Sequence, residues 1–227
     1  MIRLICASDT AGTEQTEALA WLNYVETQRR DSSYLERVEN RLALLEPYDQ
    51  ARYWTLQKNF TAAKKALTGV HIQSSLERFL FAEIEEGLGD YESAYSIFFE
   101  LYQENKERWD AGLKAGTTLL KARQGDRNAL LEAARIFDEL EKQKPFDTRL
   151  LTNKAFIALN QGNLRKAERL LVKALQQDPD NLKALENMVY LQILNNNTLQ
   201  SKLFLDRLEA KHPDYVGLEA LKKRIHS

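Results

Sequence analysis

Residues Thr148–Asn181, TRLLTNKAFIALNQGNLRKAERLLVKALQQDPDN, contain the pattern that decides the fold. Apolar residues recur at spacings of three and four on both sides of Gln161-Gly162-Asn163, which predicts two amphipathic helices joined by a tight turn. The sequence Asp178-Pro179-Asp180 ends the second helix, because proline cannot continue it. Small residues stand where the two helices must approach closely: Ala155, Ala167 and Ala174. The stretch therefore predicts one antiparallel helix pair.

The same features recur along the chain at a fixed 34-residue step. Two sets of residues keep this step, namely the prolines Pro145, Pro179 and Pro213 and the small residues Ala133, Ala167 and Ser201. A helix-turn-helix unit of this length with this pattern resembles the tetratricopeptide repeat. The resemblance implies an all-α fold, a right-handed α-solenoid of antiparallel helix pairs (a tetratricopeptide-like superhelix) with a C-terminal capping helix.

We expect one continuous solenoid over residues 14–227, preceded by a loose N-terminus over residues 1–13, where no periodicity is evident. The predicted helix pairs cover residues 14–46, 47–70, 75–104, 109–144, 148–178 and 182–211, and the capping helix covers residues 215–225. The fourth pair is unusual because the step from Ala94 to Ala133 is longer than the steps between the later small residues. Extra length is therefore expected at its turn and at the start of its second helix. Gly112 and Gly116 predict a close helix approach in this pair.

A short aromatic-rich segment has two interpretations. It contains Tyr91, Tyr95, Phe98, Phe99 and Tyr102. Such residues could form a stacking platform for bases. Their spacings of three, four and seven instead favour the buried face of a helix.

Composition limits the possible partners. The 32 Lys and Arg residues balance 33 Asp and Glu residues, for a formal net charge of −1, which argues against a nucleic-acid partner. No run approaches the ~18 apolar residues of a membrane-spanning helix, so membrane insertion is not expected. As written, the chain is expected to be cytoplasmic, or periplasmic or envelope-associated if its native start lies upstream. The single cysteine, Cys6, excludes an intrachain disulfide.

The residues that carry catalysis or bind metals in other proteins are scattered here. His71, His212 and His226 are far apart, and none has a second histidine or a carboxylate at zinc-ligand spacing. There is no glycine-rich phosphate loop and no nucleophile-elbow sequence. The sequence therefore predicts a protein that is not an enzyme and that needs no cofactor or metal.

The resemblance also implies a binding surface. In the family, the first helix of each repeat lines a concave groove that holds a partner peptide. The positions that correspond in the fifth and sixth repeats give a predicted site made of Arg149, Asn153, Phe156, Asn160, Lys183, Asn187 and Tyr190. The asparagine amides would bind a peptide main chain and the basic residues a carboxylate, although both could equally be merely solvated side chains.

The N-terminal half places Asp49, Glu83 and Glu86 on the corresponding face, so one end of the groove is expected to be acidic and the other basic. The leading hypothesis is a non-catalytic scaffold or adaptor that binds a protein or peptide segment, within a bacterial envelope, secretion or pilus assembly. The alternative is a regulatory peptide-sensing repeat domain or the noncatalytic arm of a larger enzyme. The identity of the partner and the oligomeric state stay open.

Overall fold

The computed structural model describes residues 2–27 and 32–225, with side chains from residue 12 onward, apart from residue 32. All regular structure in this part of the chain is helical. The elements are α1 (Ile2–Thr27), α2 (Ser32–Glu39), the 3-10 helix η1 (Leu42–Leu44), α3 (Pro47–Leu56), α4 (Phe60–Ala66), α5 (Ser75–Leu88), α6 (Tyr91–Glu104), α7 (Trp109–Ala122), α8 (Arg127–Glu141), α9 (Thr148–Asn160), α10 (Leu164–Gln177), α11 (Leu182–Leu194), α12 (Thr198–Lys211) and α13 (Leu218–Ile225).

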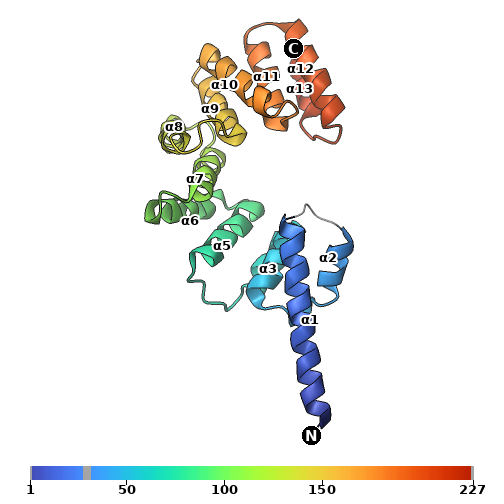
Figure 1. The fold of residues 1–227 in the computed structure, drawn as a ribbon. Coiled ribbons are helices and arrows are strands. Elements are labelled where there is room, and N and C mark those ends of the chain that lie inside the picture. Colours follow the sequence, from blue (N-terminus) through green and yellow to red (C-terminus); the bar gives the residue numbers. More distant parts are fainter. Residues whose placement is uncertain (1, 28–31, 226–227) are drawn as a thin grey trace. The chain divides into compact units, whose positions relative to one another are not determined.

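The chain forms two compact units, unit 1 over residues 1–101 and unit 2 over residues 102–227. In unit 2, α7 pairs with α8, α9 with α10 and α11 with α12 (Figure 1). In unit 1, α1 packs with α2, and α3 with α4. Helix pairs of this kind confirm the predicted all-α fold of the tetratricopeptide type.

Short-range hydrogen bonds fix where the helices of the best-matching repeats begin. The side chain of Asn163 accepts a bond from the backbone N–H of Lys166 at the start of α10. Asn181 caps α11 in the same way by accepting from the N–H of Ala184. Gly162 has a φ of +71°, the left-handed conformation that glycine adopts without strain. The predicted turn is therefore confirmed.

The small residues of the period lie at the helix crossings. Each is buried, and all but one is the fourth residue of the second helix of its pair: Ala63, Ala94, Ala167 and Ser201. The exception is Ala133, which is the seventh residue of α8 and is also buried. Helix α8 thus begins about one turn earlier than its counterparts relative to the crossing. Most of the extra length predicted in the fourth pair lies in this extension.

The two glycines of α7 permit a close approach, as predicted. A Cβ atom on Gly116 would lie 2.4 Å from the ring of Phe137, and one on Gly112 would lie 2.9 Å from both Tyr102 and Leu140. Those distances are too short for an alanine without movement of the neighbours. The glycines therefore determine how near α7 lies to the side chains around it.

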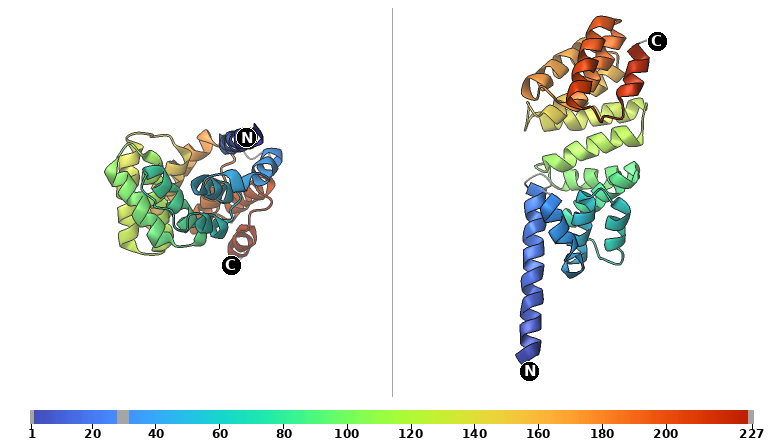
Figure 2. Two further views of the ribbon diagram at one scale, coloured as in Figure 1. Left: turned by 90° about the horizontal axis from the view of Figure 1, so that it is seen from below. Right: turned by 90° about the vertical axis from the view of Figure 1, so that its right-hand side faces the viewer.

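Unit 1 differs from the expectation at its N-terminus. A loose segment over residues 1–13 is predicted, but α1 is helical from Ile2 onward. Figures 1 and 2 show its N-terminal half extending past α2 and α3. The segment before Gly12 contains no proline, and local backbone hydrogen bonds can propagate a helix without an apolar stripe. Periodicity detects buried faces only, and so it misses such an extension.

The aromatic residues of α6 belong mainly to the core. Phe98, Tyr102 and Tyr95 are buried, and the rings of Phe79 and Phe98 pack edge to face with centroids 5.0 Å apart. This confirms the core interpretation over a stacking platform. A fully buried ring that the period does not single out is Tyr53 of α3.

The C-terminal helix covers the last repeat. Leu218 and Leu221 of α13 are buried together with Leu185, Val189, Leu205 and Leu208. The predicted capping helix is thus present, although it begins at Leu218 instead of Tyr215. In the part of the chain that the structure describes, no helix has the combination of length and apolar character needed to cross a membrane. Cys6 and His226 lie outside the residues with described side chains.

Candidate functional site

The predicted site residues of α9 lie along its exposed stripe. Arg149, Asn153, Phe156 and Asn160 are exposed or half-buried, whereas the residues between them are mostly buried in unit 2. Phe156 is 40% exposed although it lies in the middle of the helix. The stripe is the α9 part of the candidate site.

The polar side chains of this stripe are partly engaged. The guanidinium of Arg149 forms an ion pair with Asp147 at 3.0 Å and lies 4.9 Å from the ring centroid of Trp109. Burial raises the pKa of Asp147, but hydrogen bonds from Arg149 and the N–H of Leu150 outweigh it, so the pKa is lowered. The amide of Asn160 donates to the carbonyl of Phe156 at 2.8 Å.

Asn187 does not lie where the prediction puts it. Its side chain is 7% exposed, and its amide donates to the carbonyl of Thr152 at 3.4 Å. This bond links α11 to α9, so the amide serves the packing of neighbouring repeats. Asn153, at the corresponding position of the preceding repeat, is half-buried. The two asparagines therefore differ in exposure, and Asn187 is not part of the exposed surface.

The positive charge of Lys183 is balanced by a neighbouring carboxylate. Its Nζ atom lies 2.7 Å from Glu186 Oε2, and it lies 5.4 Å from the ring centroid of Tyr215, whose hydroxyl donates to the same carboxylate. Burial lowers the pKa of Lys183, but the bond to Glu186 outweighs it and the pKa is raised. Burial and the bond to Glu186 likewise raise the pKa of Tyr215. Lys183 is therefore already paired with a carboxylate of this chain, and it is not a vacant site for the carboxylate of a partner.

Three residues at 34-residue steps form what we call the aromatic row: Phe156, Tyr190 and Arg224. They come from the neighbouring helices α9, α11 and α13, and the guanidinium of Arg224 lies 5.2 Å from the ring centroid of Tyr190. Leu194, one turn beyond Tyr190, is 53% exposed. The row can offer a partner an apolar surface with a cation at one end.

The predicted site did not include Arg224. The signal was available, since Arg224 keeps the 34-residue step from Tyr190. Among the described side chains, no three His, Cys, Asp or Glu residues are grouped so as to hold a metal ion.

The fold defines the class of protein. A tetratricopeptide repeat protein from Parabacteroides merdae has a similar structure, with a TM-score of 0.70 and 17% identity over 94% of this chain and 86% of that one. PilW, a type IV pilus biogenesis factor, is similar at a TM-score of 0.62 and 17% identity, covering 79% of this chain and 84% of that one. At such identities the similarity shows the fold alone. The chain is a helical repeat protein of the tetratricopeptide class.

The family follows from sequence. The model of the coatomer epsilon subunit matches residues 113–226, half of the chain, and this chain belongs to that family. Coatomer subunit epsilon-1 of Arabidopsis thaliana is 31% identical over 85 residues, which are 37% of this chain and 28% of that protein. Coatomer subunit epsilon-2 of Oryza sativa subsp. indica is 31% identical over 96 residues, 42% of this chain and 30% of that protein. The matches thus span less than a third of each relative.

Proposed function

We propose that the chain is a non-catalytic scaffold subunit of a protein assembly, and that it holds a segment of another subunit against the exposed stripe of α9 and the aromatic row. Its relatives are named as epsilon subunits of the coatomer, and these names describe one subunit of a larger assembly. The region matched by the family model contains the whole row. A bacterial envelope, secretion or pilus assembly has no support beyond the fold, since the pilus protein is only 17% identical to this chain.

The single observation that carries the proposal is the exposure of the Phe156 ring on the stripe of α9. An exposed aromatic ring gains free energy when a partner covers it, and aromatic residues dominate the energetics of many interfaces. Lys183 and Arg149 already form ion pairs with carboxylates of this chain. We therefore expect them to contribute more to the orientation of a bound protein than to its affinity. We therefore expect apolar contacts to determine how strongly the partner binds.

The test is a purification of the tagged full chain from its native host after mild crosslinking. We expect it to recover a reproducible set of protein subunits, and the variant Phe156→Ser to lose most of that recovery. Val172→Ser is the matched control, because Val172 on α10 is also 40% exposed but lies outside the row.

Two results would contradict the proposal. One is a chain that elutes without bound proteins. The other is equal recovery of the subunits by both variants, each shown to be folded by circular dichroism, since the aromatic row would then contribute nothing to assembly.

A further inference from the structure

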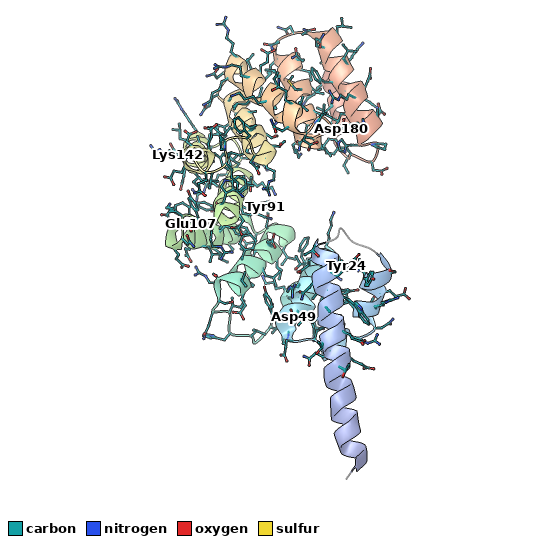
Figure 3. The ribbon with its side chains drawn as sticks, in the orientation of Figure 1. Tyr24, Asp49, Tyr91, Glu107, Lys142 and Asp180 are labelled. Atoms are coloured by element: carbon teal, nitrogen blue, oxygen red, sulfur yellow. The ribbon has the colours of Figure 1, made fainter. Side chains whose placement is uncertain are left out.

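Helices α1 and α2 and the turn after α2 share a surface rich in arginine and aromatic side chains, which we call the Trp21 cluster. Its members are Trp21, Tyr24, Tyr34, Arg37 and Arg41. Figure 3 labels one of them, Tyr24, which is 43% exposed. The cluster belongs to unit 1 and lies outside residues 113–226, so neither the family match nor the aromatic row includes it. Tryptophan, tyrosine and arginine are the residue types that most often dominate binding at protein interfaces.

The Trp21 cluster is separate from the groove that first helices line. Asn23 and Glu26 of α1 bind Arg52 of α3, so that side of α1 meets the next first helix. The side of α1 that carries the cluster meets α2 instead, and the ring centroids of Tyr24 and Tyr34 lie 4.7 Å apart. Both helices of the first pair therefore form the cluster, whereas first helices alone line the predicted groove.

The two guanidinium groups of the cluster gather around one indole ring. Cζ of Arg37 lies 5.7 Å from the ring centroid of Trp21 and 5.3 Å from that of Tyr34. Cζ of Arg41 lies 4.9 Å from the ring centroid of Trp21. Cation–π contacts of this kind hold a guanidinium in place and leave N–H groups at its edge for other partners. An arginine that is held in advance loses less conformational entropy when it binds an anion.

Neither arginine of the cluster has a carboxylate partner. Within the described residues, the guanidiniums of Arg37 and Arg41 form no ion pair or hydrogen bond, and Nε of Arg41 is buried without a partner. Arg52 of the same unit is instead paired with two carboxylates. Glu36 and Glu39 lie one or two positions from an arginine along the chain, a spacing at which helical side chains do not face each other. The fold thus leaves two cations with unused hydrogen-bonding capacity.

We propose that the Trp21 cluster is a second binding surface, for an acidic segment of a partner protein. Carboxylates of that segment accept charge-assisted hydrogen bonds from Arg37 and Arg41, whose planar guanidiniums can each donate two parallel bonds to one carboxylate. The exposed ring of Tyr24 packs against adjoining apolar atoms of the same segment. The arginines thereby recognise the partner, and the rings that contact them keep them in position.

The surface suits a nucleic acid less well than a protein. A base needs an open ring face on which to stack, but two guanidiniums already contact the ring of Trp21. Exposed carboxylates also lie on the same two helices, at Glu17, Glu36 and Glu39, and they would repel a continuous polyanion. A protein segment carries its carboxylates at separate positions, so it can meet the arginines and avoid these groups.

The test is a selection of random displayed peptides on the full-length protein, with the double variant Arg37→Gln/Arg41→Gln used to remove peptides that bind elsewhere. We expect the retained peptides to carry Asp or Glu residues close together. For one such peptide, Kd should rise roughly tenfold or more on the double variant, and less on Arg37→Lys/Arg41→Lys, which keeps the charge but loses the planar fork. Glu17→Gln should lower Kd, because Glu17 lies one turn before Trp21 on the same face of α1 and repels an acidic peptide. Binding should weaken as salt is added.

The matched control is Arg165→Gln/Arg169→Gln, which changes two exposed arginines four positions apart on α10 in unit 2. It alters the net charge equally and should leave the peptide Kd unchanged. Retained peptides that are not acidic, a failure to retain any, or equal Kd values for the parent and a folded Arg37→Gln/Arg41→Gln variant would overturn the proposal. So would a different occupant whose binding that variant abolishes: a single-stranded oligonucleotide, vesicles that contain phosphatidylserine, or a second copy of the chain in sedimentation velocity.

Discussion

Truncation of Leu171 tests the register of the best-matching repeat. Leu171 of α10 is fully buried in a cluster formed with residues of α9 and α11, including Ala155 and Met188. The change Leu171→Ala removes three carbon groups, which at about 0.8 kcal/mol each amounts to about 2.4 kcal/mol of lost burial. The residual cavity adds about 24 cal/mol per Å³, so we expect a total loss of about 3–5 kcal/mol in the free energy of unfolding.

The adjacent residue supplies the control. Val172→Ala removes side-chain carbon from the exposed face of the same helix turn, and alanine has the higher helix propensity. We expect this variant to remain within about 0.5 kcal/mol of the parent. Urea unfolding followed by far-ultraviolet circular dichroism measures both. The reasoning is refuted if Leu171→Ala is as stable as the parent, or if both variants lose the same free energy.

Three further changes probe other contacts. Ala167→Leu should cost about 1–3 kcal/mol by overpacking the α9–α10 crossing, and an unchanged thermal melt would contradict this. Gly116→Ala should lower stability by about 1–3 kcal/mol despite better helix propensity, because the new Cβ meets Phe137; a more stable variant would show that this ring moves aside. Lys154 is buried with its Nζ 2.6 Å from Asp138, and although burial lowers its pKa, the carboxylates beside it raise it overall. Its contribution to stability is therefore complete below the unfolded pKa of about 10.4 and is lost as pH rises through the folded pKa. The difference in free energy of unfolding between the parent and Lys154→Met should therefore shrink only above about pH 10.4. A difference that has the same value from about pH 8 to about pH 11.5 would contradict this.

The repeat framework could be predicted because its signals are local and periodic. Gly162 and the asparagine after it mark a turn whatever the rest of the chain does, and Ala167 must be small because a helix crosses there. These constraints recur in successive repeats, so an error in one repeat is corrected by the next. The displaced Ala133 was detected for the same reason, as a break in a regular step.

The contact surface was less predictable, because it depends on which side chains bind one another across repeats. The sequence shows that Asn153 and Asn187 occupy equivalent positions, but it does not show that the amide of Asn187 is buried against the carbonyl of Thr152. Similarly, no spacing rule connects Arg52 to Glu26, which lies on another helix. Long charged side chains can reach several partners, so their pairing follows from the packed structure.

The caps described for α10 and α11 have a consequence for how such a chain can grow. One asparagine starts each of these helices through a bond to a residue three positions ahead, so both start signals lie inside the same 34-residue stretch. A duplicated copy of that stretch would therefore contain the N-cap residues of both helices. Lengthening the array by gene duplication therefore requires no new folding information, only a neighbour with an apolar face to pack against.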